Sequence, residues 1–84
     1  MSVAPDLAAG LAPDEARIEK HSVLLRGHRT SISLERAFWR ALVAAAEAEG
    51  TTINALVARI DEGRSGNLSS AIRVWLLSRA GTAS

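Results

Sequence analysis

The fold expected for this chain follows from one segment, Arg29-Thr30-Ser31-Ile32-Ser33-Leu34. Polar and apolar residues alternate along it, which is typical of a strand with one buried face. Most of the remaining sequence instead predicts helix. Because a lone strand cannot satisfy its own backbone N–H and C=O groups, we expect it to pair with the same strand of a second copy. The expected fold class is therefore mainly α with one β-strand, in an intertwined homodimer with an intermolecular two-stranded antiparallel ribbon.

The length and composition favour a small domain that assembles with itself. The chain has 84 residues and no cysteine, so it forms one domain at most and has no disulfide or thiolate metal site. So short a chain buries little surface, and dimerisation is the common remedy. The N-terminus lacks the pattern of a signal peptide, and no apolar run approaches the roughly 20 residues of a membrane span. The expected location is the cytoplasm.

The formal net charge of +1 hides an asymmetry between the two ends of the chain. Residues 1–19 hold four acidic residues and one arginine, whereas residues 20–84 hold nine basic and five acidic residues. Nine of the ten basic residues are arginine, which favours bidentate contacts to phosphate or guanine. The basic part therefore indicates an anionic partner.

Composition divides the chain at residue 20. Residues 1–20 contain both prolines and few large apolar residues, so we expect a flexible N-terminal tail in which residues 12–18 are compatible with one helical turn. The domain proper is expected at residues 21–84. Within it, the apolar residues Val23 and Leu25 have odd numbers, whereas Ile32 and Leu34 have even numbers. This change of phase predicts a bulge, a turn or a strand start at Gly27.

Three helices follow, at about residues 36–49, 53–62 and 68–79. Each carries an apolar stripe at helical spacing. Gly50 is placed to end the first helix in the left-handed conformation, and Thr52 is placed to cap the second. The apolar side chains expected in a core shared by two copies are Ile32, Leu34, Phe38, Trp39, Leu42, Leu56 and Ile60.

The order of strand, helix, Gly-Thr-Thr turn and helix resembles the ribbon-helix-helix superfamily of DNA-binding proteins, which includes the Arc and MetJ repressors. The resemblance covers about residues 28–62 and rests on residues 30–36, residues 50–57 and the spacing between Leu34 and Gly50. Residues 28–35 and 67–73 are similar to a subgroup of short, largely uncharacterised bacterial members. The third helix extends the minimal fold.

The resemblance implies that two paired strands enter the DNA major groove as a ribbon. By position, Arg29, Ser31 and Ser33 are the side chains that would face the bases. Arginine can donate two hydrogen bonds to guanine, and a serine hydroxyl can donate or accept one.

The resemblance also implies a phosphate clamp at the start of the second helix. Helix-start N–H groups and the helix dipole favour an anion at such a place. The residues expected to contact phosphates are Thr51, Thr52, Ile53 and Asn54, together with Arg26 and Arg36 beside the ribbon.

The chemistry of an enzyme or a metalloprotein is not expected. His21 and His28 do not supply the several convergent ligands that a metal needs, so we expect no metal and no cofactor. No serine or aspartate has a recognisable histidine partner for catalysis, and the chain is short for a preorganised pocket.

The function expected from the sequence is a homodimeric transcriptional regulator, a repressor, that binds double-stranded DNA. Two alternatives stay open. One is an antitoxin of the same fold, which would carry a toxin-binding segment after the second helix. The other is a protein-interaction module that uses the third helix or the tail as its contact surface.

Overall fold

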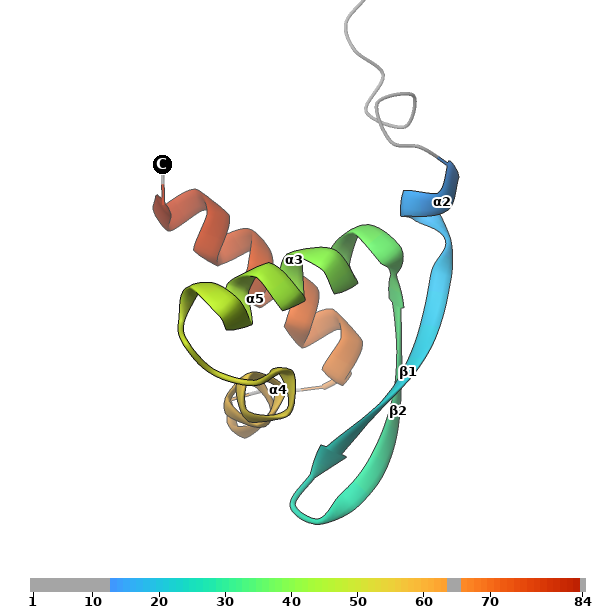
Figure 1. Ribbon diagram of the computed structural model, residues 1–84, viewed down its shortest axis with the longest axis vertical. Coiled ribbons are helices and arrows are strands. Elements are labelled where there is room, and N and C mark those ends of the chain that lie inside the picture. The colour runs from blue at the N-terminus through green and yellow to red at the C-terminus, as the bar shows by residue number, and fades with distance from the viewer. Residues whose placement is uncertain (1–12, 64–65, 84) are drawn as a thin grey trace, which may run out of the picture.

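A β-hairpin lies along one side of three helices in the computed structural model, which describes residues 13–63 and 66–83. Figure 1 shows the hairpin as a long twisted ribbon, with a short helix at the open end of the hairpin beside the start of the first long helix. In chain order the elements are α2 (Pro13–Ala16), β1 (Ile18–Leu25), β2 (His28–Glu35), α3 (Arg36–Ala48), α4 (Ile53–Glu62) and α5 (Leu68–Ala83).

The strand partner lies in the same chain. β1 pairs antiparallel with β2, and the register runs from Leu25 opposite His28 to Ile18 opposite Glu35. The two strands are joined by Arg26 and Gly27, which have φ values of +53° and +81°. Two successive residues at positive φ make the type I′ turn, whose twist matches that of a hairpin. The expectation of a single strand with no partner in its own chain is therefore wrong, because a two-residue turn at Gly27 folds residues 18–25 back onto it.

This turn also explains the change of phase in the sequence. With two residues in the connection, each odd-numbered residue of β1 lies opposite an even-numbered residue of β2. Directly opposite residues share a face. Val23 and Leu25 therefore lie on the same buried face as Ile32 and Leu34.

The ordered hairpin begins earlier than the expected domain boundary at residue 20. Residues 18–20 belong to β1 and lie opposite residues 33–35. The backbone N–H of Arg36 donates to the carbonyl of Arg17 over 2.8 Å, which extends the pairing by one more position. The expected tail therefore extends too far: residues 13–20 form α2 and the first part of the hairpin, since β2 supplies their backbone partners. The rest of the expected tail, residues 1–12, lies outside the described residues.

The turn between α3 and α4 confirms both predicted helix-end residues. Gly50 has a φ of +67°, and the N–H of Thr51 donates to the carbonyl of Ala46 over 2.9 Å, the bond that closes a left-handed helix end. The hydroxyl of Thr52 accepts from the N–H of Ala55 over 3.0 Å. This bond satisfies a donor in the first turn of α4. The helix bounds match the predicted ones within a residue, except that α5 extends to Ala83.

A single chain buries the apolar residues that were expected in a shared core. Leu34, Leu42 and Leu56 are completely buried, and Phe38 packs against them while partly exposed. The indole N–H of Trp39 also donates to the carbonyl of Glu19 over 3.2 Å, which holds α3 to β1. The burial of the inner strand face therefore does not need a second copy. Among the described residues, no helix combines the length and the apolar character needed to cross a membrane.

Candidate nucleic-acid interface

The outer face of the hairpin carries the three side chains that were expected to face DNA bases. Opposite pairs on this face are Lys20 with Ser33, Ser22 with Ser31, and Leu24 with Arg29. We call the side chains of these six residues the reading face. Arg29 and Ser31 are exposed, and Ser33 is half-buried. Strand alternation places them here because Ile32 and Leu34 occupy the opposite, buried face.

The charge of the reading face is positive, and one of its two cations lies beside a serine hydroxyl. A guanidinium nitrogen of Arg29 lies 3.5 Å from the hydroxyl of Ser22 on the neighbouring strand. Lys20 adds a second cation. The carboxylate at the end of β2, Glu35, is engaged elsewhere: Arg73 of α5 donates to it over 2.9 Å. The face therefore offers two cations and three serine hydroxyls to a ligand.

The pKa of Glu35 lies below its ordinary value of 4.5. The main cause is a hydrogen bond from its own backbone N–H, and the bond from Arg73 adds to it. Hydrogen bonds and a nearby cation favour the charged form of a carboxyl. Glu35 thus serves as a link between the end of the hairpin and α5.

The outer edge of β2 has no neighbouring strand among the residues that the structure describes, where the sheet has two strands. In an antiparallel pair, residues alternate between bonding across the pair and pointing their N–H and C=O away from it. The N–H of Leu24 donates to the side chain of Asn54 over 3.1 Å, so Leu24 points away from β2. Its opposite residue, Arg29, then points its backbone groups away from β1, as do Ser31 and Ser33 further along. This edge can therefore accept another strand.

A groove flanks the hairpin on the β1 side, between β1, α3 and the start of α4. We call it the flanking groove. It brings together four of the six residues that were expected to contact phosphates, namely Arg36, Thr52, Ile53 and Asn54. The N–H groups in the first turn of α4 have no partners within the helix. The contact of Asn54 with Leu24 fixes the distance between this helix start and the hairpin. The other lining residues are Glu19, His21, Ser22, Trp39, Arg40, Val43, Ala44 and Glu47.

The remaining two expected phosphate contacts lie elsewhere. Thr51 belongs to the turn between α3 and α4, where its N–H is used by the carbonyl of Ala46. Arg26 lies at the tip of the hairpin, and its guanidinium is 3.6 Å from the carboxylate of Asp61 on α4. The predicted phosphate residues thus form one cluster of four with two outliers.

Sequence reasoning missed the contribution of β1 to this surface. Lys20, Ser22 and Leu24 share the reading face because of the hairpin register, and Arg40 lines the flanking groove one helical turn after Arg36. The change of phase at Gly27 was the signal that could have placed β1 beside β2. Arg40 follows Arg36 at the i, i+4 spacing of a common helix face.

A second groove runs between α4 and α5. Its lining includes Arg59, Ile60, Val74 and Trp75. On the outward side of α5, Val74 is 61% exposed and Leu77 is 64% exposed, while Leu68, Ile72 and Leu76 are buried on the other side. α5 is therefore apolar on two sides, and the fold buries only one of them.

His21 and His28 belong to no group of three or more possible metal ligands in the part of the chain that the structure describes. The ring of His21 instead lies 4.1 Å from the ring of Trp39, between centroids.

The described chain is thus a two-stranded antiparallel ribbon followed by three helices, and a comparison with known families identifies its class. The model of the ribbon-helix-helix domain family matches residues 18–80, and the chain belongs to this family. No curated protein matches the chain.

One solved structure is similar over most of the chain. It is an uncharacterized protein from Bordetella pertussis Tohama I, with 26% sequence identity and a TM-score of 0.72. The match covers 84% of this chain and 62% of that protein, so the chain spans less than two thirds of its length.

Proposed function

We propose that this chain is a sequence-specific DNA-binding transcriptional regulator, a repressor, that reads the major groove as a homodimer. The observation that carries the proposal is the reading face, on which Arg29 and the two serines of β2 stand together on a rigid hairpin. The apolar side chains of the inner face are buried against the helices, whereas the outer face is open to a ligand. Its two cations suit a polyanion.

In the proposed dimer, a second copy pairs along the outer edge of β2. The two β2 strands then form the centre of a four-stranded sheet, with β1 on each flank. Three spacings of about 4.8 Å put the outermost strands about 14 Å apart, which exceeds the roughly 12 Å width of the major groove. We therefore assign base contacts to Arg29, Ser31 and Ser33 of the central strands. Lys20 and Ser22 of β1 are assigned to the phosphates at the groove rim.

The flanking groove supports the same assignment. It lies on the β1 side of the hairpin, where the DNA backbone would pass in this dimer. Arg36 and the backbone N–H groups of Ile53 and Asn54 at the start of α4 are donors that suit phosphate oxygens. Together with Lys20 they would neutralise the strand on each side of the ribbon.

Selection of bound fragments from genomic DNA tests the proposal, followed by titration of the selected site. We expect Arg29→Ala to weaken binding to the selected site about tenfold to a hundredfold, because a good bidentate pair contributes about 1–3 kcal/mol of discrimination. The affinity for random DNA should fall much less. The matched control is Arg59→Ala, which removes the same charge on α4, where Arg59 pairs with Glu49 over 2.8 Å. Equal effects of the two variants would contradict base reading by Arg29.

The dimer has its own test. Ser31→Pro removes an N–H that points away from β1, so the hairpin is kept and the pairing with a second β2 is lost. Ser22→Pro is the matched control, since Ser22 lies directly opposite Ser31 and its N–H points to the other edge. Sedimentation equilibrium should show at least tenfold weaker dimerisation for Ser31→Pro and little change for Ser22→Pro. A dimer of unchanged strength in Ser31→Pro contradicts pairing through β2.

A protein-interaction role is the second candidate, and the exposed Val74 and Leu77 on α5 favour it. Apolar side chains that are left uncovered on one helix face are typical of a protein contact. If the selection yields no preferred DNA and the chain binds random DNA no better than a charge-matched control protein does, this second role replaces the first. Val74→Ser with Leu77→Ser should then abolish partner binding without affecting the hairpin.

A further inference from the structure

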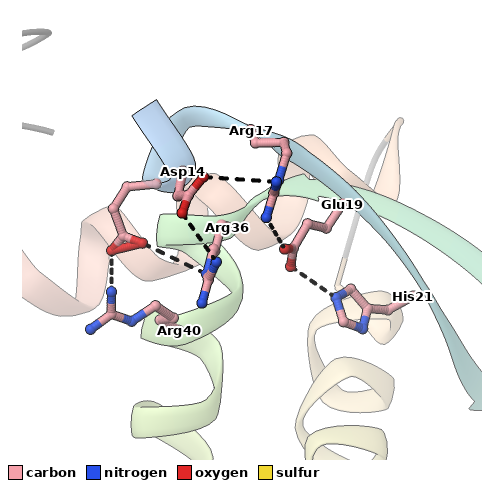
Figure 2. A network of polar contacts seen from close by, with 7 residues as sticks. Asp14, Arg17, Glu19, His21, Arg36 and Arg40 are labelled. Atoms are coloured by element: carbon pink, nitrogen blue, oxygen red, sulfur yellow. Dashed lines mark hydrogen bonds and ion pairs between the residues drawn. The ribbon is translucent and has the colours of Figure 1, made fainter. Parts of the chain in front are cut away.

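Two acidic residues of α2 lie on the arginines of the flanking groove. Arg36 on α3 has a guanidinium nitrogen 3.9 Å from the carboxylate of Asp14 and another 4.0 Å from that of Glu15. The carboxylate of Glu15 also accepts a hydrogen bond from Arg40. Figure 2 shows Asp14 above Arg36, with Arg40 one turn further along the helix. We call Asp14 and Glu15 the acidic strap.

The hairpin holds the strap in this position. Arg17 follows the strap closely, and its carbonyl accepts from the N–H of Arg36 over 2.8 Å. The N–H of Arg17 in turn donates to the carbonyl of Asp14 over 3.2 Å, and its guanidinium lies 3.7 Å from the Asp14 carboxylate. The same guanidinium is 3.6 Å from Glu19 on β1. The backbone pairing of the hairpin ends at Arg17, and this places the acidic strap over Arg36 and Arg40.

The two carboxylates of the strap contact the two guanidinium groups of Arg36 and Arg40, and Asp14 is also close to Arg17. Arg40 stays 67% exposed and Arg36 40% exposed, so both remain within reach of a ligand. Ion pairs at such exposure are weak, and a competing anion can displace them.

We propose that the acidic strap is an autoinhibitory element that competes with DNA phosphates for Arg36 and Arg40. This inference rests on the proposed function, because it regulates the flank of the same DNA-binding surface. The carboxylates of Asp14 and Glu15 occupy the guanidinium groups when DNA is absent. On a matched site, the contacts of the reading face keep the phosphates beside the groove, and the phosphates replace the carboxylates. On random DNA those contacts are missing, and the strap stays in place. The strap thereby lowers the affinity for both kinds of DNA: for a matched site by the free energy needed to displace the carboxylates, and for random DNA by the smaller free energy of the arginine contacts that are not made.

The test neutralises the strap in the full chain. Asp14→Asn with Glu15→Gln should raise the affinity for the selected site about three- to tenfold, because the phosphates no longer have to displace two weak ion pairs, and for random DNA by no more than this factor. The slope of log affinity against log salt concentration should steepen by about 0.9 for each arginine that gains a phosphate. Fluorescence titration at several salt concentrations measures both quantities.

The matched control is Glu49→Gln with Glu62→Gln. It changes the net charge equally and releases Arg59 and Arg79, which pair with Glu49 away from the flanking groove. A second control introduces the strap substitutions into Arg36→Ala with Arg40→Ala, where they should no longer change the affinity. An equal gain in the Glu49 control, or a gain that survives without Arg36 and Arg40, overturns the strap and leaves only a general charge effect.

The outcomes separate the strap from the proposed function. Binding that depends on Arg29 but is unchanged by neutralising the strap overturns the strap alone. Binding that is weak in the natural sequence and becomes strong only after neutralisation supports both. If no variant binds DNA, including the neutralised one, the proposed function fails and the strap inference fails with it.

Discussion

The two faces of the β-hairpin are built from residues that alternate along the same two strands, yet they have opposite surroundings. On the inner face, Val23, Leu25, Ile32 and Leu34 are buried against the helices of the same chain. On the outer face, lysine, arginine and serine side chains stand next to solvent. One short element therefore contributes to the core with one face and leaves the other face open to a ligand.

This division follows from strand geometry. Successive side chains of a strand point to opposite faces, so a substitution on one face leaves the packing of the other largely unchanged. The hairpin itself is fixed from three directions: Trp39 bonds to Glu19, Asn54 bonds to Leu24, and Arg73 bonds to Glu35. The outer residues are therefore presented on a rigid support, which a loop of the same length would not provide.

The largest effect is expected from a substitution on the inner face of the hairpin. Leu34 is completely buried, and Leu34→Ala should destabilise the fold by about 2–5 kcal/mol through lost burial and the cavity left behind. A domain of this size has a total stability of only about 5–15 kcal/mol, so much of it is lost. Urea unfolding followed by circular dichroism measures the change. Ser31→Ala on the outer face is the comparison and should stay within about 0.5 kcal/mol. Similar losses of stability for the two variants would contradict the separate roles of the inner and outer faces.

The second largest effect is expected at the turn that sets the register between β1 and β2. Gly27 has a φ of +81°, and a Cβ added there meets no atom within 4 Å, so Gly27→Ala has a backbone cost alone. That cost is about 1–2 kcal/mol. Gly63 is the matched control, since its φ is −98° and a Cβ there also has open space. Thermal unfolding should therefore show a clear loss for Gly27→Ala and little change for Gly63→Ala. If both glycines tolerate alanine equally, the type I′ turn is not what sets the register.

The local parts of the fold could be predicted from the sequence. The bounds of α3 and α4 follow from apolar spacing and from the end residues Gly50 and Thr52, because helix formation and capping depend on residues within one or two turns. The hairpin could not be predicted with the same ease. Residues 18–22 carry no apolar alternation, and their strand conformation comes from pairing with β2 rather than from their own pattern.

The residues of the candidate site likewise fall into those that a local pattern places and those that long-range pairing places. The outward positions of Arg29, Ser31 and Ser33 follow from alternation in one strand, so the sequence was sufficient for them. Lys20 and Ser22 join the reading face only through the register of the hairpin. The strap on Arg36 depends on where the first pair of the hairpin ends, which is a tertiary feature. The pairing between residues far apart in the chain is therefore what could not be predicted from the sequence.

The smallest expected effect concerns Glu35, where the hairpin meets α3 and α5. Its pKa lies below the ordinary value of 4.5, first through its own backbone N–H and then through Arg73. A carboxyl with a lowered pKa in the folded state contributes stability that is present above about pH 4.5 and is lost as the pH falls through the lowered pKa. Because the group is partly exposed, we expect a contribution below about 1 kcal/mol.

Glu35→Gln should therefore flatten the loss of stability between about pH 5 and pH 3, as measured by urea unfolding at each pH. The loss should not disappear, since the pKa of Glu49 is also lowered, mainly by a hydrogen bond from Arg59. Arg73→Gln tests the cause: it should flatten the same part of the curve, and combining it with Glu35→Gln should add little, because the two side chains share one bond. Additive effects would mean that Arg73 stabilises the fold through its contact with the Phe38 ring, 5.9 Å from the ring centroid, and not through the end of the hairpin.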